Sequence, residues 1–112
     1  MRAILIQMTE PYPIHRIASY TLVDPAIRDW CRRHSLFLLT DYKDYDVRSV
    51  DVVSSRGRKC QVWIDPPEHG AVTVHIWPYG PPHERLTTSI EDFAKTLEQA
   101  YDLACRLLRI KV

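Results

Sequence analysis

Hydrophobic and polar residues alternate along three segments in the middle of the chain. The segments are residues 47–54, 59–65 and 71–77. They are rich in β-branched and aromatic residues and are separated by turn-forming Gly, Pro and Ser, so we predict an antiparallel meander over residues 47–77. Residues 3–8 and 14–23 carry a weaker β pattern. We therefore expect an antiparallel sheet of four to five strands.

Two further segments repeat apolar residues at helical spacing. Residues 25–35 follow Asp24, which we expect to cap the helix, with Pro25 at its first position. Residues 90–108 follow Ser89, and Asp92 stands three positions later, as in a capping box. The apolar stripe of this second helix comprises Ile90, Phe93, Ala94, Leu97, Ala100, Tyr101, Ala104, Leu107 and Leu108. The pattern predicts a single α+β domain, residues 1–112, whose short helix (25–35) and long C-terminal helix (90–108) cover one face of the sheet.

The alternation also assigns the two faces of the strands at 59–65 and 71–77. One face is entirely apolar and is expected to pack against the helices: Cys60, Val62, Ile64, Val72, Val74 and Ile76. The opposite face carries Gln61, Trp63, His75 and Trp77. Because large apolar groups outside a core are typical of binding surfaces, we interpret this face as an interaction site. An alternative interpretation places residues 1–23 over it as a second small core.

The register between these strands determines which polar groups meet on that face. We expect Asp51 to pair with Gln61, Gln61 with His75, and Trp63 with Thr73. Two interstrand steps then separate Asp51 from His75, about 9.6 Å. This register argues against a direct hydrogen bond between that carboxylate and the imidazole.

Charge and hydropathy argue against several classes of partner and location. The 112 residues include 15 Lys and Arg against 14 Asp and Glu, a net charge of +1, which argues against nucleic acid as the partner. The apolar run at residues 3–6 is too short for a signal peptide, and no stretch approaches the ~18–20 apolar residues of a membrane helix. We therefore predict a cytoplasmic protein with no membrane partner.

The order of one helix, three strands and one helix resembles the double-stranded-RNA-binding domain in topology. That resemblance implies lysines at the start of the last helix, where they would meet phosphates. Here the helix opens instead with Ser89, Ile90, Glu91 and Asp92. The acidic residues at this position argue against RNA binding by that mode.

Cysteine, histidine and glycine spacing points to no cofactor. Cys31, Cys60 and Cys105 are odd in number and lack Cys-x-x-Cys spacing, so we interpret them as reduced structural thiols. His69, His75 and His83 lie within fifteen positions, but their spacings match no zinc pattern. The three glycines are isolated in turns, so they cannot form a phosphate-binding loop.

A loop predicted at residues 41–46 combines carboxylates with tyrosines. Its candidate contact residues are Asp41, Tyr42, Asp44 and Tyr45. Carboxylates steer a basic partner toward a surface and tyrosines supply contact area. The simpler interpretation is a solvated loop whose aspartates stabilise turns.

These observations favour a non-enzymatic domain that binds a protein partner. The predicted contacts are Trp63, His75, Trp77 and Gln61, together with the loop at residues 41–46. In general character this resembles small inhibitors of the immunity or antitoxin type. One alternative is a small-molecule pocket or enzyme in which His75 is the acid/base and Asp51 or Asp65 orients it. Another is a self-associating structural domain. It would form a homodimer in which the outer sheet face is the two-fold interface.

Overall fold

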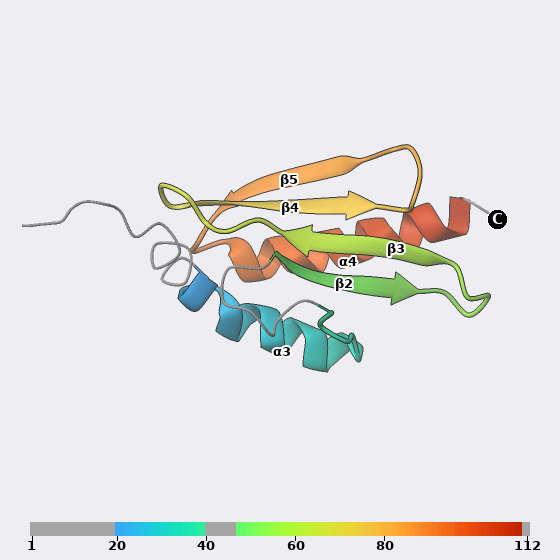
Figure 1. The fold of residues 1–112 in the computed structure, drawn as a ribbon, viewed down its shortest axis with the longest axis horizontal. Coiled ribbons are helices and arrows are strands. Elements are labelled where there is room, and N and C mark those ends of the chain that lie inside the picture. The colour runs from blue at the N-terminus through green and yellow to red at the C-terminus, as the bar shows by residue number, and fades with distance from the viewer. Residues whose placement is uncertain (1–19, 40–46, 111–112) are drawn as a thin grey trace, which may run out of the picture.

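Four antiparallel strands form a meander sheet in the computed structural model, which describes residues 20–39 and 47–110 (Figure 1). The strands are β2 (Arg48–Val53), β3 (Lys59–Ile64), β4 (Ala71–Trp77) and β5 (Glu84–Ser89). They are neighbours in the order β2-β3-β4-β5. The first three confirm the predicted meander. β5 extends the sheet beyond Trp77 and was not identified from the sequence.

Two helices complete the α+β fold, as predicted. α3 (Asp24–His34) packs against α4 (Phe93–Ile110), and α4 lies across all four strands (Figure 1). α4 begins at Phe93 rather than at residue 90 because residues 90–92 form a turn. The Ser89 hydroxyl accepts a hydrogen bond from the backbone N–H of Asp92 at 3.2 Å, so this serine does stabilise the entry to the helix.

The prediction that Asp24 caps the start of α3 is wrong. The N-cap residue is Val23, and no side chain caps the helix there. The Asp24 carboxylate instead accepts hydrogen bonds from Arg48 of β2, at 3.0 Å from Nε and 3.2 Å from Nη2. The partner lies far away in the sequence, so a local pattern could not reveal it.

The prediction of a weak β segment at residues 14–23 is also wrong where the structure describes it. Tyr20 begins a short helical turn, and the N–H of Val23 donates to its carbonyl at 2.9 Å. The Tyr20 hydroxyl donates to the backbone carbonyl of Ile64 at 2.7 Å. Residues 20 and 23 are buried in the main core, so this part of the chain packs with the helices. The weak β segment at residues 3–8 lies outside the described residues.

The core lies between the helices and one face of the sheet. All six apolar residues assigned to this face are at most 1% exposed. Ile27 and Trp30 of α3 and Leu97 of α4 close the core from the other side. Ala94 departs from the predicted stripe of α4 because it is exposed. The rest of the alternation is confirmed, since each face keeps its character along both strands.

The register between β3 and β4 differs from the predicted one by two positions. Trp63 pairs with His75, and Gln61 pairs with Trp77, whereas the predicted pair of Asp51 with Gln61 is correct. His69 and Gly70, whose φ angles are 52° and 79°, form a tight turn that pairs Glu68 with Ala71. Between this turn and the pair of Ile64 with Val74, the β3 side carries one residue more than the β4 side, and this extra residue sets the register. A shift by two preserves the faces.

Candidate functional site

The sheet face opposite the helices, called the outer face below, brings together four of the predicted contact residues. Trp63 and His75 are direct neighbours across the strands, and Gln61 is paired with Trp77. Gln61, Trp63 and Trp77 are half-buried, while His75 is only 8% exposed. The other four predicted contacts, Asp41, Tyr42, Asp44 and Tyr45, lie outside the described residues, as do residues 1–19.

Three side chains form a hydrogen-bonded chain on this face. Nε2 of His75 lies 2.7 Å from Oδ2 of Asp65, and Nδ1 of His75 lies 2.9 Å from Nε2 of His83. His75 comes from the middle of β4, Asp65 follows the end of β3, and His83 directly precedes β5. We call this group the Asp65–His75–His83 chain. It joins a buried imidazole to an exposed one.

The chemistry of the acceptors fixes the order of protons along the chain. A carboxylate only accepts, so Nε2 of His75 carries the hydrogen that is donated to Asp65. In a neutral His75, Nδ1 is then an acceptor and receives the N–H of His83 Nε2. The second nitrogen of a neutral His83, Nδ1, is left with a free lone pair. The arrangement can therefore pass a proton between His83 and the buried imidazole.

Aromatic packing holds both imidazoles in place. The Trp63 ring stacks on His75 with the ring centroids 4.5 Å apart and the planes 10° from parallel, and it lies 5.2 Å from His83. Desolvation and the positive charge of Arg85 lower the pKa of His83 below its ordinary value of 6.5, with His75 as a smaller cause. His83 is thereby kept neutral to a lower pH than an isolated histidine.

A second aromatic group lies beside the first. Trp77 and Tyr79 have their ring centroids 4.5 Å apart, and the Tyr79 hydroxyl donates to Oδ1 of Asp51 at 2.6 Å. Desolvation and the Asp51 carboxylate raise the pKa of Tyr79 to about 12, so its hydroxyl stays protonated at neutral pH. Asp51 is thus engaged by Tyr79 and takes no part in the Asp65–His75–His83 chain.

The sequence identified part of this site. Trp63 and His75 were placed on the outer face by alternation, and Asp65 was named as one possible partner of His75. His83 was considered only as a metal ligand, and Tyr79 was missed. Both residues follow β4 in the connection to β5, so recognising the polar strand at residues 84–89 would have shown that the chain returns toward His75.

Metal and thiol chemistry receive no support from the described residues. Among residues 20–39 and 47–110, no three His, Cys, Asp or Glu side chains are arranged to hold a metal ion. Cys31 and Cys60 are buried, and burial raises the pKa of the Cys60 thiol to about 11. A buried thiol with a raised pKa is a poor nucleophile.

Comparison with known proteins gives no family assignment. No protein family, curated protein or solved structure matches this chain. Within the described segments, neither helix is both long and apolar enough to cross a bilayer. The functional argument therefore depends on the geometry of the site alone.

Proposed function

We propose that this protein binds a protein partner through its outer face, with Trp63 and Trp77 as the main contacts. The observation that carries the proposal is the stack of Trp63 on a buried His75, itself held by Asp65 and His83. An aromatic ring that is already fixed loses little entropy when a partner covers it. Partly exposed tryptophans of this kind are typical binding hot spots.

The charges around the tryptophans favour a partner that presents Lys or Arg. The carboxylates of Asp51 and Asp65 lie close to the rings of Tyr79 and His75, beside Trp77 and Trp63. A cation over a tryptophan face gains from the ring quadrupole, and a nearby carboxylate adds to this attraction. Of the cations on the same face, Lys59 lies at a strand end, whereas Arg85 of the edge strand pairs with His75.

Two cavities of the molecule lie apart from the tryptophans of this face. Cavities of about 350 and 430 Å³ lie at one end of the molecule. Neither of these two cavities is lined by Trp63, Trp77 or the Asp65–His75–His83 chain. Small-molecule sites are concave, whereas protein interfaces are broad and need no cavity.

The proposal is tested by identifying the partner and then measuring its affinity for variants. Native mass spectrometry of the untagged protein, purified gently from its source, identifies a stoichiometric companion. The dissociation constant of the purified pair is then measured for Trp63→Ser and Trp77→Ser. Because hot-spot truncation costs at least about 2 kcal/mol, each variant is expected to weaken binding about 30-fold or more.

Leu22→Ser is the matched control. Leu22 is a large apolar residue, 62% exposed, that lies just before α3 and belongs to no strand of the outer face. Its replacement should leave the dissociation constant unchanged. Equal affinity of the wild type and both tryptophan variants would refute the proposal, as would a small ligand in place of a protein. A homodimer that dissociates in the tryptophan variants would support self-association instead.

A second candidate function, proton transfer, is favoured specifically by the Asp65–His75–His83 chain. In this role His83 is the catalytic base that touches a substrate, because it is exposed and its Nδ1 carries the free lone pair. His75 takes up or returns the proton, and Asp65 is the positioning residue that orients His75. The sequence-derived pairing of His75 with Asp65 is thus retained in this candidate, whereas Asp51 is not part of it.

Acylation by diethyl pyrocarbonate, a reagent for neutral imidazole, tests this candidate. At pH 6, a histidine with the ordinary pKa is mostly protonated, whereas the lowered pKa of His83 leaves more of it neutral. We expect His83 to be acylated faster than the exposed His69 at this pH, measured by peptide mass spectrometry. Arg85→Gln, which removes the larger electrostatic cause of the lowered pKa, should narrow this difference more than His75→Phe, which keeps an aromatic ring beside Trp63 and removes the smaller cause. Equal rates for His83 and His69 in the wild type would exclude the candidate.

A further inference from the structure

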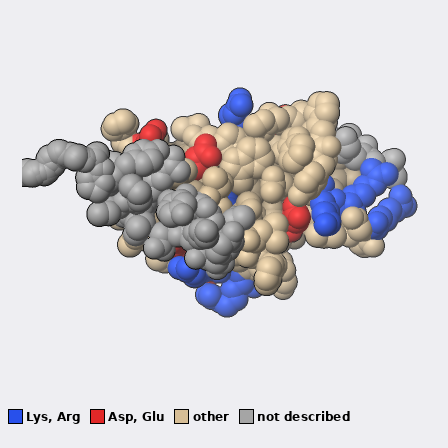
Figure 2. Space-filling model, viewed as in Figure 1, with Lys and Arg blue, Asp and Glu red and all other residues tan. Residues whose placement is uncertain are grey.

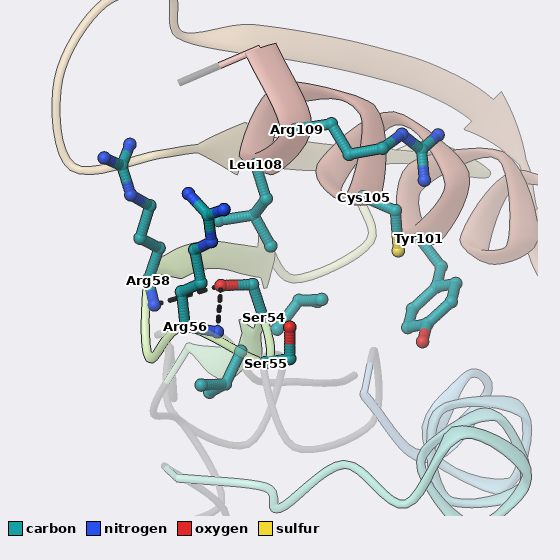
Figure 3. A pocket seen from close by; sticks show the side chains of 10 residues that line it. Ser54, Ser55, Arg56, Arg58, Tyr101, Cys105, Leu108 and Arg109 are labelled. Carbon is teal, nitrogen blue, oxygen red and sulfur yellow. Dashed lines mark hydrogen bonds between the residues drawn. The ribbon is translucent and has the colours of Figure 1, made fainter. Parts of the chain in front are cut away.

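A cavity of about 350 Å³ lies on the helix side of the sheet, between the β2–β3 turn and the C-terminal half of α4. Its apolar wall is formed by Val52, Leu108 and the ring of Tyr101, with the Cys105 thiol beside them. Figure 3 shows Arg56 and Arg58 extending from the turn on one side, while Arg109 extends from α4 on the other. We call this space the arginine cavity.

Among the residues that the structure describes, nothing compensates the charge of the cavity. No described Asp or Glu lines it, and none of its three guanidinium groups forms an ion pair with a described residue. Other arginines of the same chain are paired, for example Arg48 with Asp24 and Arg33 with Glu98. Figure 2 shows basic side chains gathered at the end of the molecule where the β2–β3 turn and the end of α4 lie. Such a site attracts anions.

The turn that carries two of the arginines is held by its own hydrogen bonds. The Ser54 hydroxyl accepts the backbone N–H groups of Arg56 at 3.3 Å and Arg58 at 3.1 Å (Figure 3). The backbone N–H of Gly57 donates to the Ser54 carbonyl at 2.9 Å, and Gly57 adopts φ 82°, which favours glycine. The backbone positions of both arginines are therefore fixed before a ligand arrives.

We propose that the arginine cavity binds a small organic anion, an apolar body that carries a carboxylate or phosphate group. The planar guanidinium group matches both of these oxyanions through paired hydrogen bonds. The apolar wall requires an apolar body, and the volume lies within the range of known ligand sites, about 300–1,000 Å³. A second cavity shares Arg58 and Leu108 with the first and is also lined by Lys59, Pro78 and Tyr79, the last of which borders the outer face.

This site is separate from the proposed partner-binding face. Tyr101, Cys105, Leu108 and Arg109 belong to α4, which packs on the opposite side of the sheet from Trp63. The two proposals can therefore succeed or fail independently.

Titration calorimetry with four simple probes tests the proposal. Octyl phosphate and octanoate carry both an anionic group and an apolar body, so at least one of them should bind, and the stronger of the two identifies the preferred head group. Inorganic phosphate lacks the apolar body and octanol lacks the charge. Both should bind at least about ten-fold more weakly, octanol because it loses a charge-assisted hydrogen bond and inorganic phosphate because it loses the burial of the octyl chain.

Arginine variants locate the binding. Arg56→Gln and Arg109→Gln should each weaken octyl phosphate or octanoate about ten-fold. Arg106→Gln is the matched control, because Arg106 is exposed on the same helix but does not line the cavity. All three residues are exposed, so their replacement should leave the fold intact, which far-UV circular dichroism checks.

Cys105 provides a second readout at the site itself. It is half-buried in the cavity wall, whereas Cys31 and Cys60 are buried. Bound probe should slow the alkylation of Cys105 by iodoacetamide, measured by mass spectrometry. The proposal is overturned if no probe binds at millimolar concentration, if octanol binds as well as the anions, if the two arginine variants bind like the wild type, or if Cys105 gains no protection.

Discussion

At the scale of single residues, the ion pair of Asp24 and Arg48 connects the start of α3 to β2. The two side chains are 15% and 4% exposed, and the guanidinium carbon of Arg48 lies 4.3 Å from the centroid of the Tyr20 ring. Removing Asp24 takes two charge-assisted hydrogen bonds from a buried guanidinium group. We therefore expect Asp24→Ala to lower the free energy of unfolding by about 1.5–3 kcal/mol, measured by urea denaturation.

Asp29 supplies the control on the same helix. It pairs with Arg32 and Arg33, but its side chain is 48% exposed. Since exposed pairs contribute little, Asp29→Ala should change the free energy of unfolding far less than Asp24→Ala does. The double variant Asp24→Leu, Arg48→Met should lose less stability than the sum of the losses in Asp24→Leu alone and in Arg48→Met alone. If Asp24→Ala were no more destabilising than Asp29→Ala, the pair would not hold α3 to the sheet.

At the scale of elements, sequence periodicity predicted the helices and strands whose burial follows a local pattern. α3, α4 and the strands β2 to β4 each bury one side, so their apolar residues recur at the period of the element. β5 was missed because it lies at the sheet edge and reads Glu-Arg-Leu-Thr-Thr-Ser, with a single large apolar residue. An edge strand that packs on a small part of the core need not be apolar.

The features of the site that the sequence did not predict depend on how distant strands pair. Which face Trp63 and His75 occupy depends on alternation alone, so the sequence was sufficient. Which polar groups meet there depends on register, which the turn at His69 and Gly70 sets together with one extra residue on the β3 side of the hairpin. The contact of His83 with His75 further requires β5 to return beside β4. Non-local pairing of this kind leaves no periodic signal.

At the scale of the whole molecule, one continuous core links every element described. Trp30 of α3, the inner face of the sheet and Leu97 of α4 belong to the same buried cluster. A chain of this length with a single core is expected to unfold in one cooperative step. If residues 1–112 are a single domain, as predicted, the helix signal and the core signal are expected to be lost together on unfolding.

Two optical probes test this cooperativity. In a Trp63→Phe, Trp77→Phe background, fluorescence reports Trp30 alone, while far-UV circular dichroism reports the helices. The two urea transitions should coincide, because α3 cannot keep Trp30 buried once α4 leaves the sheet. Leu97→Ala, at a fully buried position, should lower the free energy of unfolding by about 2–5 kcal/mol in both signals. Leu22→Ala, 62% exposed, should leave both almost unchanged, and separate transitions for Trp30 and for the helices would show that the chain does not unfold as one unit.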